Sequence, residues 1–427
     1  MRRLLVLGSV SSALLAIAAC AASDDETEAP HAEPDEALAD AGAGRDVAVA
    51  SDAPVEARGA VCSSDGWCET TLPDVGLTIK DIWPLPGRAF ALAESRSFGI
   101  RALEWNEADS TWRYIDDNSQ NEALADHATR IWSPNADEVY YAAAPGTIYH
   151  GTRPAPPATA WSWSRERLPE NVPDRTEDAK DLILGVWGVG SDIYAWRSNT
   201  IFRRASEDGG ALGWVPEHTV DDADNPVEVF YITGAAGTRP DEVWFRGYRF
   251  GGNFINCEIL IRRTPEGYHR IADGVATFRQ CTPRDGGPPP LPSPSGASNA
   301  LSSQFHTSDG RRFFLLQPPN QYSQLTMEGE SLSVTVGSVP SAVVRAPRWT
   351  ATWSESADRL WLAGGGQNAR WGVVMRGSEI GDGGSYQYSS TVLNGAPLTK
   401  LPTQIRGTSP TNLWAVGEGY ALHKTTP

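Results

Sequence analysis

What this 427-residue sequence lacks most clearly is helical periodicity. Beyond the first twenty residues, no stretch of ten repeats apolar side chains at the three- and four-residue spacing that buries one face of a helix. Val, Tyr, Trp and Thr instead alternate with polar residues between turns that contain Gly, Asn or Asp, which is typical of β-strands. The sequence therefore predicts an all-β protein.

Positive charge is scarce. The sequence has 36 Lys and Arg residues against 53 Asp and Glu residues, and its formal net charge is −17. Proteins that bind nucleic acids neutralise phosphates with clusters of Lys and Arg. We therefore expect no nucleic acid partner.

Catalytic signatures are also missing. There is no G-x-S-x-G elbow of the kind that a serine hydrolase needs, and the seven His residues include no pair at metal-ligand spacing. Thr307–Gly310 resembles the Asp box of propeller sialidases, but it is isolated and one residue short. We name no catalytic residue and predict binding. Carboxylates for glycoside hydrolysis would come from distant parts of the chain, so a carbohydrate-active hydrolase or lyase is the alternative.

The first twenty residues have the features of a targeting signal. Two Arg residues precede the apolar run Leu4–Ala19, which is too short for a stable membrane span. The run ends in Ile17-Ala18-Ala19-Cys20, which resembles the lipobox of bacterial lipoproteins. The resemblance implies a signal peptide over residues 1–19 and a lipid anchor on Cys20. No Asp follows Cys20, which in such lipoproteins favours the outer membrane or cell surface. An ordinary secretory signal is the other interpretation.

Residues 20–60 have almost no large apolar side chain. They hold eleven acids between Asp24 and Glu56, opposed only by Arg45 and Arg58. Such a segment cannot bury enough apolar surface to offset its ordering entropy. We predict a disordered acidic tether over 20–60, followed by one domain over 61–427.

Four cysteines remain once Cys20 carries lipid. Cys62 and Cys68 are close in sequence, and Cys257 and Cys281 fall within one repeat. An even number in an exported protein favours two local disulfides. A metal site is the competing interpretation, but no His lies at a useful spacing beside either pair.

The domain is organised by a repeat of about fifty residues. Its last copy, Ile405–Lys424, contains three short strands joined by tight turns, and the earlier copies start near residues 79, 129, 184, 230, 302 and 350. A fourth extended stretch follows each of those six. A four-stranded antiparallel sheet of this size is a propeller blade, so we predict a seven-bladed β-propeller. The insertion 273–301 leaves six or eight blades open.

The last copy stops without its fourth strand, and Gly66–Leu72 matches the missing piece. Pairing these segments would join both ends of the domain in one sheet and remove an open edge. This arrangement resembles the closure of WD-repeat propellers, without their Gly-His and Trp-Asp signatures. The repeat is more similar to bacterial surface lipoproteins built from D-x-V-W-A-V-G-x-x-G-x-L units, a resemblance that covers about 66–424.

Tryptophans recur at one position of the repeat. Trp83, Trp132, Trp187 and Trp353 each end a predicted first strand. Large rings fill the widening space between blades, so we expect packing residues. The alternative is an aromatic lining of the central channel that stacks on sugars or other flat ligands.

Long connections from fourth to first strands should emerge on one face, where we expect function. The fourth repeat is the most elaborated, with a lengthened loop at 247–257 and a Pro-rich insertion. Its candidate binding residues are Tyr248, Arg249, Phe250, Phe254 and Arg284. Asp222, Asp224 and Glu228 are Ca²⁺ candidates in an acidic loop, although they lack the spacing of an EF-hand. A solvated loop is the alternative, and we expect no other cofactor.

Together these observations predict an envelope-anchored binding or scaffold module. Its ligand, a protein or a glycan, would meet the long-loop face. Besides the carbohydrate-active enzyme, the remaining alternative is a passive platform within a larger envelope complex.

Overall fold

The structure is a computed structural model. It describes residues 61–122, 127–169, 184–206, 210–222, 228–250, 256–277, 280–291, 305–317, 321–345, 347–356, 359–366, 371–377 and 384–426. The predicted signal peptide, Cys20 and the tether lie outside these residues, as do Asp224 and Phe254. In the described residues, no helix has the length and apolar character needed to cross a membrane.

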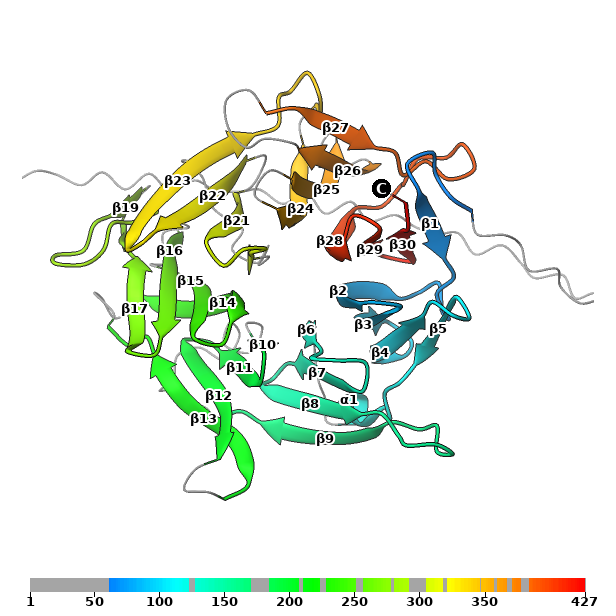
Figure 1. The fold of residues 1–427 in the computed structure, drawn as a ribbon, viewed down its shortest axis with the longest axis horizontal. Coiled ribbons are helices and arrows are strands. Elements are labelled where there is room, and N and C mark those ends of the chain that lie inside the picture. Colours follow the sequence, from blue (N-terminus) through cyan, green and yellow to red (C-terminus); the bar gives the residue numbers. More distant parts are fainter. Residues whose placement is uncertain are drawn as a thin grey trace, which may run out of the picture. The chain divides into compact units, whose positions relative to one another are not determined.

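Seven four-stranded antiparallel sheets form a ring in the described part of the chain, as predicted (Figure 1). The first three blades are β2 (Thr78–Leu85), β3 (Arg88–Ser95), β4 (Gly99–Asn106), β5 (Thr111–Tyr114); β6 (Ala128–Trp132), β7 (Glu138–Ala143), β8 (Thr147–Thr152), β9 (Ser162–Arg167); and β10 (Leu184–Val189), β11 (Asp192–Arg197), β12 (Thr200–Ser206), β13 (Leu212–Thr219). Within each of these three blades the strands pair in sequence order, and the first strand lies nearest the centre of the ring.

The next three blades follow the same order, and the seventh takes its outer strand, β1, from the start of the domain. They are β14 (Val229–Arg239), β15 (Glu242–Phe250), β16 (Asn256–Thr264), β17 (Gly267–Ala272); β20 (Phe305–His306), β21 (Arg312–Gln317), β22 (Gln321–Glu328), β23 (Ser331–Ser338); β24 (Arg348–Ser356), β25 (Arg359–Gly366), β26 (Trp371–Gly377), β27 (Tyr386–Ser389); and β28 (Pro402–Ser409), β29 (Asn412–Gly417), β30 (Tyr420–Lys424), β1 (Trp67–Thr70). In its described residues, the insertion after β17 contains the hairpin β18 (Val275–Thr277) and β19 (Gln280–Thr282) and adds no blade to the seven. The one helix in the described residues is α1 (Ser119–Glu122).

The seventh blade is closed by both ends of the domain. β1 pairs antiparallel with β30, with Trp67 opposite Lys424. The Trp67 indole N–H donates to the Ser389 hydroxyl of the sixth blade at 2.8 Å, and the Trp67 ring meets Trp361 edge-on at 6.1 Å. The predicted closure is confirmed, and β1 also joins the seventh blade to the sixth.

Apolar clusters lie between neighbouring blades. Trp414 of the seventh blade packs against Trp105 and Trp112 of the first, at ring distances of 5.7 and 5.4 Å. Trp244, Trp361 and Trp414, which share one position in the second strands, are each at most 2 % exposed. These rings are packing residues because every blade must bury both of its faces against its neighbours.

A threonine at a β-bulge recurs in the first strands. The register skips Thr129, Thr350 and Thr403, so each stands opposite no partner residue. Each hydroxyl donates to a carbonyl of the second strand, at 3.0 Å to Ala142, 3.1 Å to Ala363 and 3.0 Å to Val416. The side chain thus satisfies backbone polarity at the irregularity that bends the innermost strand.

Candidate functional site

A cavity of about 240 Å³ lies where first strands from five blades end. Its lining comes from β2, β10, β14, β20 and β28 and comprises Trp83, Pro84, Trp187, Gly188, Ala235, Ala236, Gly237, Phe305, His306, Thr307, Arg406, Gly407 and Thr408. First strands end at the short turns into the second strands. The cavity therefore lies toward the short turns, whereas we expected function on the long-loop face.

Side chains near the ends of the first strands pack on the following blade. Trp83 meets Trp132 at a ring distance of 6.4 Å, and His306 meets Trp353 at 6.1 Å. Trp132 and Trp353 are 3 % exposed, which confirms their packing role. Trp83 is only partly buried, as is Trp187, and both line the cavity as well as packing between blades. Trp83 and Trp187 thus pack between blades and also line the channel, and stacking on a ligand stays a prediction.

Small residues make room between these rings. A Cβ on Gly188 would stand 2.6 Å from the Trp132 ring, so only glycine allows β10 to approach that closely. On the neighbouring blade, β14 contributes Ala235, Ala236 and Gly237 to the cavity wall. Ala236, opposite Trp244, stands where four other blades have tryptophan, and its small side chain leaves room in the cavity wall.

Arg406 is held in place by an anchored carboxylate. Its guanidinium donates to the Ile82 carbonyl at 3.0 Å, lies 3.4 Å from Asp81 Oδ1 and covers the Trp83 ring at 4.8 Å. Asp81 is 1 % exposed and accepts the backbone N–H groups of Ile82 and Ile131 at 3.0 and 3.1 Å. One carboxylate therefore connects three consecutive blades and orients a cation at the cavity.

His306 contributes a neutral imidazole. Its Nε2 lies 3.0 Å from the Ser354 carbonyl oxygen, an acceptor, so Nε2 carries the proton and Nδ1 is left with a lone pair. Burial, reinforced by the charge of Arg406, lowers the pKa of His306 to about 4. At neutral pH the cavity thus combines a cation, a hydrogen-bond acceptor and two aromatic faces.

Three of the binding residues predicted in the fourth blade, Tyr248, Arg249 and Phe250, lie in strand β15 rather than in a loop. We expected a loop over 247–257, but β15 continues to Phe250 and β16 begins at Asn256. Tyr248 packs against Tyr231 at 5.2 Å, in a small cluster with Val229 and the partly buried Phe250. Arg249 is 0 % exposed, and its part in binding stays a prediction.

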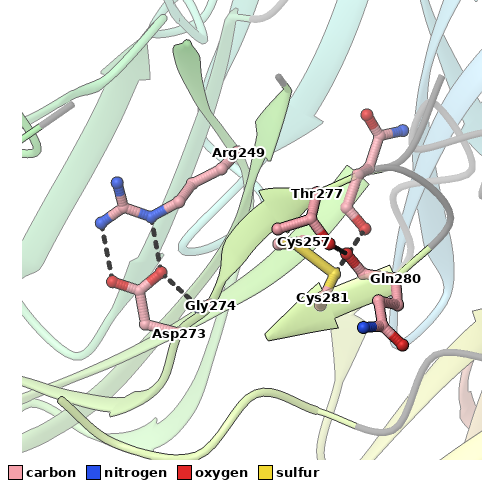
Figure 2. The surroundings of a disulfide bond; sticks show 8 residues. Arg249, Cys257, Asp273, Gly274, Thr277, Gln280 and Cys281 are labelled. Atoms are coloured by element: carbon pink, nitrogen blue, oxygen red, sulfur yellow. Dashed lines mark hydrogen bonds and ion pairs between the residues drawn. A yellow bond between two sulfur atoms is a disulfide. The ribbon is translucent and has the colours of Figure 1, made fainter. Parts of the chain in front are cut away.

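Arg249 belongs to an ion-pair cluster that includes two of the Ca²⁺ candidates. It makes two parallel bonds to Asp273, at 2.6 and 2.7 Å (Figure 2), and also lies 3.1 Å from Asp222 and 3.4 Å from Glu228. Arg284, a predicted binding residue, lies 3.0 Å from Asp222. The sequence prediction thus grouped residues that do meet, although they form ion pairs with each other.

These carboxylates are engaged by arginines. Burial alone would raise the pKa of Asp222, but Arg270, Arg249 and Arg284 lower it to about 2. Within the described ranges, no group of three His, Cys, Asp or Glu side chains is placed to hold a metal ion. Asp224 lies outside those ranges, so the Ca²⁺ site stays a prediction.

Both predicted disulfides are formed. Cys62 bonds to Cys68, and Cys257 bonds to Cys281, which links the β18–β19 hairpin to β16 beside the Arg249–Asp273 pair (Figure 2). Structural disulfides persist in oxidising compartments. The pairing agrees with an exported protein.

Sequence reasoning missed Arg406 and His306. Four blades carry Trp83, Trp132, Trp187 and Trp353 near the ends of their first strands, whereas β20 and β28 carry His306 and Arg406 there. This departure from the repeat was the available signal. Aligning the seven repeats at the ends of their first strands would have shown it.

No protein-family model matches the sequence, and no curated protein does. Among solved structures, it is similar to the extracellular domain of a putative hybrid two-component system from B. thetaiotaomicron, with 10 % identity, a TM-score of 0.49 and coverage of 84 % of this chain and 39 % of that one. It is also similar to a PL25 polysaccharide lyase, an ulvan lyase, with 9 % identity, a TM-score of 0.48 and coverage of 86 % of this chain and 95 % of that one. A third similar structure is the Swd1 β-propeller domain of Myceliophteria thermophila, with 10 % identity, a TM-score of 0.45 and coverage of 86 % of this chain and 98 % of that one. This chain therefore spans about two fifths of the length of the first protein. At such identities the matches concern the propeller fold alone.

Proposed function

We propose that this protein is an exported binding module that recognises a glycan in the cavity of its central channel. The observation that carries the proposal is the composition of that cavity, where Trp83 and Trp187 stand with Arg406 and His306. Sugar rings present C–H faces that pack on aromatic rings, and their hydroxyls pair with guanidinium donors and imidazole acceptors. Concave sites with aromatic walls and a few convergent polar groups are typical of small-ligand recognition.

Binding is expected to depend on both indole faces. Trp83→Ala and Trp187→Ala should each weaken binding of an oligosaccharide selected on a glycan array about tenfold, which is about 1.4 kcal/mol. Isothermal titration calorimetry measures the change, and a thermal melt of each variant separates it from unfolding. Phe98→Ala removes an aromatic ring that is 52 % exposed outside the channel and is the matched control. Unchanged affinity in both Trp variants would place the glycan elsewhere.

The two main alternatives predict different outcomes with the same reagents. A hydrolase or lyase would release new chain ends from the selected oligosaccharide, whereas a binding module would leave it intact. A passive platform would retain no oligosaccharide on the array. His306 is the one cavity side chain with a free basic nitrogen, so His306→Gln would abolish any turnover that depends on this cavity.

We also propose that a lipid on Cys20 anchors the protein to the outer membrane or cell surface. The lipobox-like end of the leader and the acidic stretch after it support this placement. Mass spectrometry of the mature N-terminus should find Cys20 as the first residue, carrying diacylglycerol and an acylated amine. An unmodified Cys20, or a mature protein that starts further downstream, would contradict the anchor.

A further inference from the structure

Arg130 lies deeper in the channel than the tryptophans near the ends of the first strands. It precedes Trp132 by two residues in β6, a first strand, and two strand residues span roughly 7 Å. Its charge is influenced by Asp81 of the first blade, Arg406 of the seventh and Arg246 of the fourth. β6 is also the innermost strand of its blade, and the Arg130 side chain is only half-buried on it, so it reaches the open space at the axis of the ring. Arg130 therefore points into the channel.

Arg130 is also the unmatched charge of this region. Arg406 faces Asp81 at 3.4 Å, and Arg246 makes two bonds to Glu258 at 2.8 and 2.7 Å. The Arg130 guanidinium makes no hydrogen bond or ion pair with any of the described residues. Two cation–anion pairs and one additional cation leave the channel with an excess of one positive charge.

An unmatched guanidinium is unfavourable where it stands. Burial lowers the pKa of Arg130, Asp81 opposes the shift, and repulsion from Arg406 and Arg246 adds to it. Arginine nevertheless stays protonated in proteins, so the charge persists. The chain as a whole is strongly acidic, with a net charge of −17. A positive site inside such a protein selects against cations and attracts an anion that fits the channel.

We propose that the channel binds an acidic glycan, with the anionic group of the sugar held between Arg130 and Arg406 and its ring packed against Trp83 and Trp187. This inference rests on the proposed function and adds the charge of the ligand. Guanidinium groups bind carboxylates and sulfates through paired N–H donors, so either substituent meets the requirement. Arg406 at the cavity wall and Arg130 below it give the ligand a direction, with the acidic group innermost.

The test uses oligosaccharides that differ only in charge. Calorimetry compares a galacturonate hexasaccharide with its methyl ester, and a κ-carrageenan hexasaccharide supplies sulfate on an otherwise neutral chain. We expect the wild-type protein to bind at least one acidic hexasaccharide tenfold or more tightly than the ester, with an affinity that falls as salt increases. Whichever acid binds identifies the group as carboxylate or sulfate.

Variants of Arg130 show whether this residue carries the preference. Arg130→Gln should reduce the affinity for the acid to that of the ester and leave the affinity for the ester unchanged. Arg130→Lys keeps the charge and should keep most of the preference. Because Arg130→Gln removes an unpaired charge, its melting temperature should not fall. Arg167→Gln, an exposed arginine on the outer strand β9, is the control.

The outcomes separate the two proposals. Equal binding of acid and ester by the wild-type protein, with loss of both in Trp83→Ala, overturns the charge preference and leaves the glycan site intact. A preference for the acid that survives in Arg130→Gln overturns the role of Arg130. No binding of any hexasaccharide, together with an empty glycan array, overturns the proposed function and this inference with it.

Discussion

A chain that ends at Gln404 is expected to lose the cooperative melting of the entire ring rather than that of one blade. The truncation removes most of β28 and all of β29 and β30, and it leaves β1 without its partner. Trp414, Val416 and Ala421 disappear from the core shared with the first blade, and Ile405, Leu413 and Leu422 from the core shared with the sixth.

The expected size of this loss follows from the buried side chains. Each large apolar residue contributes roughly 1.5–3 kcal/mol when fully buried, and a domain is stable by only about 5–15 kcal/mol. Opening both interfaces also exposes unpaired strand edges. Differential scanning calorimetry should therefore show no native transition near the wild-type temperature.

Two further variants control this experiment. Deleting residues 61–72 removes β1 from the opposite end of the chain and should have a similar effect, because β1 is the outer strand of the same sheet. Removing only residues 425–427 spares every strand and should lower the melting temperature by no more than a few degrees. Full cooperative melting of either large truncation would mean that the ring does not depend on this closure.

Asp273→Asn is expected to destabilise the protein by about 3 kcal/mol. Arg249 and Asp273 are 0 % and 1 % exposed, and their two parallel bonds satisfy a cation that water does not reach. Removing one partner of a buried pair costs roughly 3–5 kcal/mol because the other charge is left uncompensated. The lower end applies here, since Glu228 and Asp222 still face Arg249.

Urea unfolding measures this change, and Asp137→Asn is the matched control. Asp137 also pairs with an arginine, Arg153 at 3.1 Å, but its side chain is 73 % exposed. An exposed pair of this kind contributes about 0–1 kcal/mol. If both substitutions cost the same, the buried cluster of the fourth blade is not a stabilising element.

The fold was predictable because its information is local and repeated. A strand, a tight turn and a second strand recur seven times, so errors in one copy, such as the short β20, are corrected by the others. The closure was predictable for a related reason, since a missing fourth strand at one end matched an extra strand at the other. Both disulfides join cysteines within 24 residues of each other.

The cavity was not predictable in the same way. Trp83 and Arg406 are separated by almost the entire ring in sequence, yet the Arg406 guanidinium covers the Trp83 ring at 4.8 Å. The surroundings of Arg249 were also not predictable. The sequence predicted a loop over 247–257, but strand alternation in the lengthened β15 turns Arg249 toward Asp273 and the Phe230 ring of β14. Burial depended on where β15 ends, which local sequence does not specify.

The closing blade also determines how the ring carries mechanical load. A pull that arrives at Val61 reaches Cys62 and passes through its sulfur to Cys68, which pairs with His423 within β1. The pull therefore enters β1 at its second residue, and the chain between the two cysteines cannot be extended while the bridge is intact. The covalent bridge therefore makes β1, the outer strand of the seventh blade, a suitable point of attachment.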